Sequence, residues 1–216
     1  HIDRLHVLSL AMAEALDELN IKAIQVNAGI DNMRFRPADN KRALREKYGI
    51  TPDQPVLLHV GHIRESRNVR WLLAVQRELP ELVIIVVGST STERDETIRQ
   101  ELSDGGLKLL SDYVADIQEL YQLSDVYCFP VTKADAAMEL PLSVLEAMAT
   151  NLPILTTRFG RLPEQFEEDE GYKYIESVED IVRHIRCGFG SGIKCRNRER
   201  VENYTWEAVS KGLISG

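Results

Sequence analysis

Short, continuous apolar runs alternate with amphipathic segments along the middle of the chain. The first run, VLLHV at 56–60, ends in a glycine, as expected of a strand that is buried on both faces of a parallel sheet. Similar strand-like stretches lie at 81–89, 107–114, 125–131 and 153–157. Segments with helical apolar spacing separate them, at 69–78, 96–105, 116–124 and 141–149. This alternation predicts βαβ units with right-handed crossovers, and therefore an α/β fold with a doubly wound parallel sheet.

The flanks of this region are less regular. Apolar residues at helical spacing cover 6–19, and AIQV at 23–26 is typical of a short strand. A charged helix is expected over 39–48, followed by a glycine that stops it. Towards the carboxyl terminus the pattern weakens, and we expect only two terminal helices, at 177–188 and 204–214.

Composition and charge narrow the functional classes. The 216 residues are 44% apolar and 28% charged, which is typical of a globular domain and not of a disordered chain. The net charge of -8 disfavours non-specific nucleic-acid binding, so an anionic ligand needs a local basic cluster. Three cysteines without metal-ligand spacing favour a reducing, cytoplasmic location, and Cys128 is expected to be buried. Because the chain starts at His1 and not at Met, we expect a piece of a longer protein.

A basic cluster follows the first strand of the alternating region. The segment GHIRESRNVR contains four side chains that can carry positive charge: His62, Arg64, Arg67 and Arg70. Ligands of doubly wound sheets bind beyond the carboxyl ends of the strands, and cations at a strand-to-helix turn suit a phosphate or diphosphate. A solvated basic loop is an equally good interpretation of this feature alone. Asn68 is expected to cap the helix that follows.

The segment MELPLSVLEAMA at 138–149 places a carboxylate in a mostly apolar helix. Pro141 suits the first helical position, which leaves the N–H groups of Leu142 and Ser143 unpaired as an anion site. Ser143 and Glu146 share one helix face. Next to phosphates, a carboxylate can accept hydrogen bonds from neutral hydroxyls, so a ribose is the expected partner of Glu146. The alternative is a glutamate that is favoured only by the helix dipole.

The other segments carry less chemistry. The loop SDYVADIQEL, with Val114 at its centre, is expected to offer backbone groups to a base. Nucleophile-elbow, Walker, HExxH and GxGxxG motifs do not occur, and the glycine-rich GFGSG at 188–192 follows a helix and indicates a linker. The histidines are scattered, so no metal site is expected. No run of about 18 apolar residues is present.

Four segments carry a family resemblance through their order and spacing. They are VLLHVGHIRESRNVRWLLAV, ELVIIVVGS, DYVADIQELYQLSDVYCFPV and MELPLSVLEAMATNLPILTT. Together they resemble retaining GT-B glycosyltransferases of family 4, over residues 7–165. The resemblance implies a Rossmann-like, donor-binding C-terminal domain at 37–180, which is one half of a GT-B fold. A linker with a helix and strand from the preceding domain would cover 1–36, and C-terminal helices would cover 181–216.

The resemblance also implies a diphosphate site. In the family, a Gly-Arg…Lys set after the first strand contacts the donor diphosphate. Gly61 matches its glycine, and Arg67 stands at the Lys position and keeps the charge. His62 stands at the Arg position, where it makes a pH-dependent contact or is replaced by Arg64. Arg67 is expected to be catalytic, together with Glu139.

A second implied motif is a Glu-x7-Glu pair. Its second Glu holds the donor ribose and matches Glu146, while the helix N-terminus, here Leu142 and Ser143, meets the phosphates. Its first Glu contacts the donor sugar near the reacting carbon, but Met138 occupies that position. Either the adjacent Glu139 substitutes after a one-residue shift, or the contact is lost. The preceding DAAM also lacks the glycines that usually let this loop approach the sugar.

The leading hypothesis is a hexosyltransferase-type glycosyltransferase, or its donor-binding half. Its donor would be a nucleotide-diphosphate sugar such as a UDP- or GDP-sugar, and transfer would retain the configuration of the sugar. No cofactor or metal is expected. The acceptor site would belong to an N-terminal domain, so the chain alone is expected to be inactive, and membrane association stays open. The alternative is a degenerate GT-B half that acts as a non-catalytic nucleotide-binding or scaffold module. A nucleotide-sugar epimerase fits less well, and a Rossmann dehydrogenase is disfavoured because no Gly-rich turn follows the first strand of the sheet.

Overall fold

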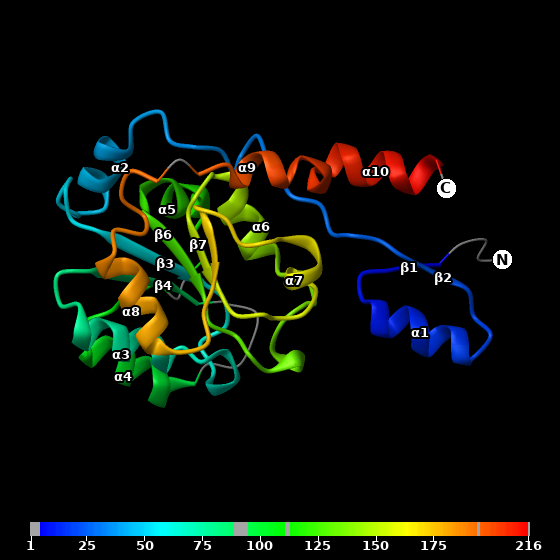
Figure 1. Cartoon of the computed structure of the whole chain (residues 1–216), viewed down its shortest axis with the longest axis horizontal. Coiled ribbons are helices and arrows are strands. Elements are labelled where there is room, and N and C mark those ends of the chain that lie inside the picture. The colour runs from blue at the N-terminus through cyan, green and yellow to red at the C-terminus, as the bar shows by residue number, and fades with distance from the viewer. Residues whose placement is uncertain (1–4, 89–94, 111–112, 194, 216) are drawn as a thin grey trace.

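A computed structural model describes residues 5–88, 95–110, 113–193 and 195–215 (Figure 1). Its main body is built on a six-stranded sheet with the order β5-β4-β3-β6-β7-β8, and all neighbouring strands pair in parallel. The strands are β3 (Val56–Val60), β4 (Val83–Val87), β5 (Lys108–Leu110), β6 (Val126–Phe129), β7 (Ile154–Thr156) and β8 (Tyr172–Tyr174). The structure confirms the predicted doubly wound, Rossmann-like α/β sheet.

Helices cover both faces of this sheet in two layers (Figure 1). One layer consists of α2 (Lys41–Lys47), α5 (Ile117–Leu123) and α6 (Leu142–Ala149). The other consists of α3 (Arg70–Glu78), α4 (Glu96–Asp104) and α8 (Val178–Arg186). Each layer buries its own apolar cluster against the strands, with Tyr127 and Ile154 in the first cluster and Leu57 and Ile84 in the second. The four central strands, β3, β4, β6 and β7, are therefore buried on both faces, which explains their apolar runs.

Polar side chains determine where several helices begin. The Asn40 side chain accepts the Ala43 N–H at 3.0 Å and starts α2. Asp95 and Ser177 do the same for α4 and α8, accepting backbone N–H groups at 3.1 Å and 3.2 Å. At the other end of α2, Gly49 takes a left-handed φ of 65° that favours glycine. These caps satisfy N–H groups that a helix leaves unpaired at its first turn.

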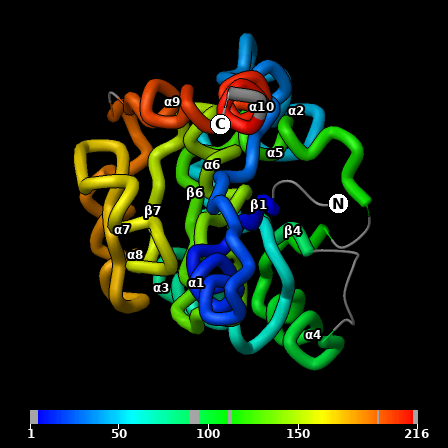
Figure 2. The backbone as a smooth tube through the Cα atoms, turned by 90° about the vertical axis from the view of Figure 1, so that its right-hand side faces the viewer, coloured from blue at the N-terminus to red at the C-terminus, as the bar shows by residue number. Residues whose placement is uncertain are grey.

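The N-terminal segment forms a small βαβ unit of its own. β1 (Leu5–Val7) pairs in parallel with β2 (Ala23–Gln25), and α1 (Leu10–Glu18) connects them. The predicted helix at 6–19 is therefore wrong at its start: residues 5–7 form a strand, and Ser9 caps α1 by accepting the Met12 N–H at 3.2 Å. Figure 1 shows this unit beside the main body, on the side towards which α10 (Trp206–Ser215) extends, and Figure 2 views the molecule from that side.

The last third of the chain contains elements that the sequence did not predict. They are α7 (Leu162–Gln165), the edge strand β8 and α9 (Asn197–Arg200). The two terminal helices predicted there correspond to α8 and α10, and the segment 188–192 has neither helix nor strand, as expected of a linker. Short 3-10 turns occur at Glu65–Arg67, Ala134–Ala136 and Glu202–Tyr204.

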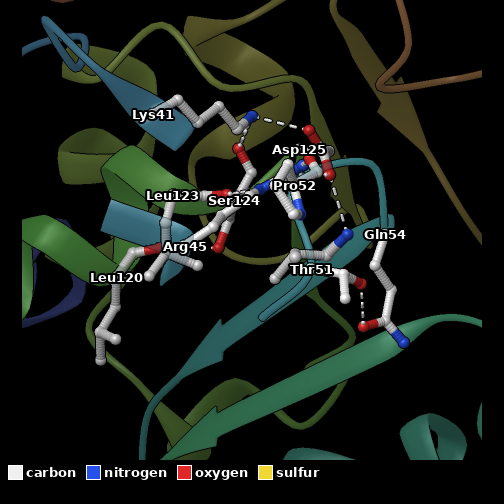
Figure 3. A network of polar contacts seen from close by, with 10 residues as sticks. Lys41, Arg45, Thr51, Pro52, Gln54, Leu120, Leu123, Ser124 and Asp125 are labelled. Carbon is white, nitrogen blue, oxygen red and sulfur yellow. Dashed lines mark hydrogen bonds and ion pairs between the residues drawn. The ribbon is translucent and has the colours of Figure 1, made fainter. Parts of the chain in front are cut away.

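A charged cluster fastens α2 to the amino-terminal edge of the sheet (Figure 3). Asp125 precedes β6 and forms ion pairs with Lys41, at 2.6 Å, and with Arg45. The same carboxylate accepts the Val56 N–H of β3 at 2.8 Å. Arg45 is only 6% exposed and also donates to the Leu123 carbonyl at 3.0 Å. Burial lowers the pKa of Lys41, against the opposing attraction of Asp125.

Candidate functional site

The winding of the sheet reverses between β3 and β6, so the carboxyl ends of these strands border the topological switch point. Asn68 joins the two ends, because its side-chain amide donates to the Pro130 carbonyl at 2.8 Å and to the Thr132 hydroxyl at 2.9 Å. Asn68 is not the helix cap that the sequence predicted. Asn68 has a left-handed φ of 52°, and its side chain is already hydrogen-bonded to residues that follow β6. Helix α3 begins two residues later, at Arg70.

Arg67 lies in the 3-10 turn after β3 and packs against Gly61. The residue is only 8% exposed, and a Cβ added to Gly61 would lie 3.1 Å from Arg67 Nη1. Nη2 is 3.4 Å from Nδ1 of His62, and within the described residues no carboxylate forms an ion pair with Arg67. Burial lowers the pKa of Arg67, but a guanidinium stays charged at neutral pH. A buried cation without a counter-ion suits an anion that a ligand brings.

The other members of the basic cluster are placed differently. His62 is half-buried, and burial and the charges of Arg67 and Arg64 lower its pKa, so the ring is neutral at pH 7. Arg64 is exposed. Arg70 forms an ion pair with Glu101 of α4 at 2.7 Å. The charge of Arg70 is thus paired within the protein, while a contact of this cluster with a phosphate stays a prediction.

The start of α6 follows the chain that leaves β6. Pro141 has an extended ψ of 123° and acts as the cap, so the helix begins at Leu142, one residue later than predicted. The Pro141 carbonyl accepts the N–H groups of Val144 and Leu145 at 3.1 Å and 3.3 Å. The N–H groups of Leu142 and Ser143 have no acceptor among the residues that the structure describes. These two groups are free, while their contact with phosphates stays a prediction.

Glu146 lies one turn further along α6 and is half-buried. Its Oε2 accepts the Tyr121 hydroxyl of α5 at 2.8 Å, and in the described part of the chain Oε1 has no hydrogen bond. Burial raises the pKa of Glu146 to about 7, although the Tyr121 hydrogen bond and the charge of Arg34 act in the opposite direction. A solvated glutamate that is favoured only by the helix dipole does not fit this environment. One carboxylate oxygen is held and the other can accept from a ligand.

Two tyrosines that the sequence analysis did not single out, Tyr121 and Tyr127, form contacts around Glu146 and the end of β3. Tyr121 holds Glu146, and its ring stacks on Tyr127 of β6 with 5.8 Å between the ring centroids. The Tyr127 hydroxyl donates to the Val60 carbonyl at the end of β3, at 3.3 Å. Tyr121 lies in an amphipathic helical segment and Tyr127 in an apolar run, where both are easily taken for core residues. The only available signal was that a buried tyrosine hydroxyl needs a partner.

Arg34 fixes the loop that precedes α5. Its guanidinium donates to the Ala115 carbonyl at 2.5 Å and to Gln118 Oε1 at 2.8 Å. Val114 packs against the edge of the apolar cluster under α5 and α6. Residues 111–112 of the predicted base-binding loop lie outside the described residues. A contact between the Val114 backbone and a base therefore stays a prediction.

Met138 and Glu139 stand where the sequence predicts a sugar contact. The Met138 side chain is 42% exposed. The Glu139 carboxylate faces α1, where it accepts the Ser9 hydroxyl at 2.6 Å and the Leu10 N–H at 3.0 Å, and the Ser9 hydrogen bond lowers the pKa of Glu139. Gly160, with a φ of 51°, packs so closely on the Glu139 backbone that a Cβ would lie 2.2 Å from its carbonyl oxygen. Glu139 is tied to the N-terminal unit, and its contact with a sugar stays a prediction.

Other site chemistry is sparse in the described part of the chain. No group of three or more His, Cys, Asp or Glu side chains there could hold a metal ion. Cys128 is fully buried, as predicted, and all three cysteines are unpaired. Among the described helices, none has the length and apolar composition needed to traverse a membrane.

Comparison with known sequences finds relatives of this chain. The family profile described as glycosyl transferases group 1 matches residues 54–187. Sulfoquinovosyl transferase SQD2 of Arabidopsis thaliana is 27% identical over 197 residues, which is 85% of this chain and 37% of that protein. D-inositol 3-phosphate glycosyltransferase 2 of Catenulispora acidiphila is 33% identical over 153 residues, which is 63% of this chain and 35% of that protein. The chain thus spans little more than a third of the length of these two curated relatives.

Solved structures share the fold. Anabaena Alr3699/HepE in complex with UDP and glucose superposes with a TM-score of 0.80 at 15% identity, covering 98% of this chain and 62% of that one. Sucrose-phosphate synthase from Thermosynechococcus elongatus gives a TM-score of 0.79 at 17% identity, covering 100% and 57%. At such low identity the likeness concerns the fold alone, a GT-B type half. Because the family profile matches more than half of the sequence, the chain belongs to the glycosyl transferases group 1 family.

Proposed function

We propose that this chain is the donor-binding half of a glycosyltransferase and binds a nucleotide-diphosphate sugar such as a UDP- or GDP-sugar. One observation carries the proposal: a buried cation and a half-buried carboxylate flank the same switch point without pairing. Arg67 has no carboxylate partner among the described residues, and Glu146 has one free oxygen there. A ligand that combines negative charges with neutral hydroxyls satisfies both groups, and a nucleoside diphosphate is such a ligand.

The parts of the ligand are assigned by charge. Arg67 and the free N–H groups of Leu142 and Ser143 take the diphosphate, with the neutral His62 ring beside them. Glu146 would repel a phosphate and accepts hydrogen bonds from the ribose. During transfer, Arg67 also stabilises the charge that develops on the departing diphosphate. Retention follows from the family resemblance, and structures of Anabaena HepE with UDP and with UDP-glucose support this ligand class.

Calorimetric titration with UDP, GDP and ADP, and with their sugar conjugates, tests the proposed function. Saturable binding of at least one of these ligands supports it. The absence of binding for all of them at millimolar concentrations contradicts it.

A substitution at Glu146 tests the placement of the ribose. We expect Glu146→Gln to weaken UDP binding about tenfold, because a charge-assisted hydrogen bond to a hydroxyl is lost. Binding of the 2′,3′-dideoxy analogue should not change, since that ligand lacks the hydroxyls. Glu170→Gln is the matched control, because Glu170 is exposed. An equal loss for both ligands would return Glu146 to a purely structural role.

We also propose that an N-terminal domain supplies the acceptor site, since the chain spans only 37% of sulfoquinovosyl transferase SQD2. The isolated chain is then expected to bind the donor but to transfer no sugar, which a turnover assay with a labelled donor would show. A cytoplasmic location fits the three unpaired cysteines, because a reducing compartment keeps thiols free.

A second candidate function is a non-catalytic nucleotide-binding or scaffold module. Met138 replaces the expected sugar-contacting Glu. The carboxylate of the neighbouring Glu139 already accepts hydrogen bonds from Ser9 and Leu10 of the N-terminal unit. This reading predicts nucleotide binding without turnover even when the chain is joined to its expected acceptor domain. Transfer of a labelled sugar by the longer protein would exclude it.

A further inference from the structure

His59 is a buried titratable residue that the proposed site does not use. It lies in β3, two residues before Gly61, and is fully buried. Its Nδ1 is 2.9 Å from the Cys128 carbonyl oxygen of β6. Because a carbonyl oxygen can only accept, Nδ1 carries the hydrogen and Nε2 presents a lone pair. Burial lowers the pKa of His59 to about 4, so this neutral tautomer persists at neutral pH.

Nε2 of His59 borders the same small space as the guanidinium of Arg67. A Cβ added to Gly61 would lie 3.4 Å from His59 Nε2 and 3.1 Å from Arg67 Nη1. In the described part of the chain, neither His59 Nε2 nor Arg67 Nε has a hydrogen-bond partner, although both atoms are buried. His59 Nε2 is an acceptor and the Arg67 guanidinium is a donor, so a single small polar molecule beside Gly61 can bridge the two side chains.

We propose that His59 is a positioning residue for Arg67 and acts through one water molecule beside Gly61. This inference rests on the proposed contact of Arg67 with the diphosphate. The water accepts a hydrogen bond from the guanidinium and donates one to His59 Nε2. The bridge offsets part of the cost of burying the guanidinium and leaves its other N–H groups for the ligand. The Cys128 carbonyl matters as well, because it selects the tautomer that offers an acceptor to Arg67.

Two substitutions separate the roles of the two ring nitrogens. His59→Gln places an acceptor near the position of Nε2, whereas His59→Asn keeps a donor near Nδ1 and has nothing at Nε2. We expect His59→Asn to weaken UDP binding about tenfold in calorimetry, and His59→Gln to stay close to the wild type. Uridine has no phosphate and should bind the wild type and both variants equally.

The variant Arg67→Met decides whether the effect passes through Arg67. In that background, His59→Asn should cause no further loss of UDP affinity, because the group that it positions is gone. An equal loss in both backgrounds, or a parallel loss for uridine, indicates a general packing defect and overturns the proposal.

A crystal structure separates a failure of this inference from a failure of the proposed function. If the wild type binds no nucleotide, the function is wrong, but the bridge between His59 and Arg67 can still be observed. We expect an ordered water in contact with both side chains in the wild type, and an Arg67 guanidinium that leaves Gly61 in His59→Asn but not in His59→Gln. A wild-type structure without that water, or an unmoved Arg67 in His59→Asn, contradicts the proposal. If His59→Asn does not fold, the wild-type water and the His59→Gln structure decide.

Discussion

At the residue scale, Arg67 and Glu146 are both withdrawn from water and yet form no ion pair with each other. Glu146 accepts the Tyr121 hydroxyl, and Arg67 lies beside a neutral nitrogen of His62. A purely structural pair of opposite charges is usually joined directly, since each ion offsets the desolvation of the other. Two unjoined charges at a switch point instead favour a ligand that reaches both of them.

The raised pKa of Glu146 has a consequence for stability. Its ordinary value is 4.5 and the folded value is about 7, so the folded state holds this proton more tightly than the unfolded state. The stabilisation is complete below pH 4.5 and is lost as the pH rises through 7. Relative to Glu146→Gln, the wild type should lose about 3 kcal/mol of unfolding free energy over this range. Urea unfolding below and above the range measures the difference, and Glu170→Gln should show none. A constant gap between wild type and Glu146→Gln would exclude an ionisation of Glu146 at this pH.

Gly61 allows Arg67 to lie close to the backbone of β3. In Gly61→Ala, the new Cβ would lie 3.1 Å from Arg67 Nη1, so the end of that side chain must move. We expect UDP binding to weaken about tenfold with little change in stability. Gly88→Ala is a matched control, because its Cβ would lie 3.2 Å from Ile63 Cδ1 at the end of the neighbouring strand, where no charged group must move. Calorimetry on both variants makes the comparison, and an equal loss in both would show that Arg67 is not involved.

Arg67 and Glu146 could be located from the sequence, because a strand-ending glycine and the helical period fix their places. The contacts of His59 and Glu139 could not. His59 meets a carbonyl that is 69 positions away, and Glu139 meets a hydroxyl that is 130 positions away. No local pattern contains such contacts, because they depend on how whole elements are packed.

At the element scale, apolar patterning predicts the buried strands and the edge strand β5, but it misses the other edge strand, β8. β4 is buried at every position and stands out as VIIVV. β8 is an edge strand with Lys173 at its centre, so its sequence gives no continuous apolar run. At the amino terminus, LHVLSL fits both periods, and only the pairing of β1 with β2 decides for a strand.

The cluster around Asp125 connects α2 to the amino-terminal ends of β3 and β6. The candidate site lies at the opposite, carboxyl-terminal ends of these strands. In Asp125→Ala, Arg45 would keep its buried charge without the carboxylate that balances it. We expect the free energy of unfolding to fall by about 3 kcal/mol, because one partner of a buried ion pair is removed. Nucleotide affinity should not change. Urea unfolding is the measurement and Asp53→Ala, at an exposed position before β3, is the control. A loss no larger than in the control would mean that water reaches and solvates Arg45.

At the scale of the whole molecule, the N-terminal unit of β1, α1 and β2 makes few polar contacts with the main body among the residues that the structure describes. Glu139 caps the start of α1, and Arg161 donates to Asn27 Oδ1 at 3.2 Å. The helix itself has no buried residue. The half-buried Glu139 therefore helps to place this unit, since one carboxylate accepts from both the hydroxyl and the backbone at the helix start.

We expect Glu139→Gln to loosen the N-terminal unit from the main body. The neutral amide accepts more weakly and turns N–H groups towards the donors of α1, so small-angle X-ray scattering should give a larger radius of gyration. Glu14→Gln changes the same charge on an exposed face of α1 and should have no effect. The pKa of Glu139 is lowered from 4.5, so its contribution is present above pH 4.5 and is lost as the pH falls through the lowered value. Acid should therefore bring the wild type towards the dimensions of Glu139→Gln. Identical scattering from all three proteins would show that the backbone around residue 30, where the Ile30 N–H donates to the Tyr204 carbonyl at 2.8 Å, is sufficient to place the unit.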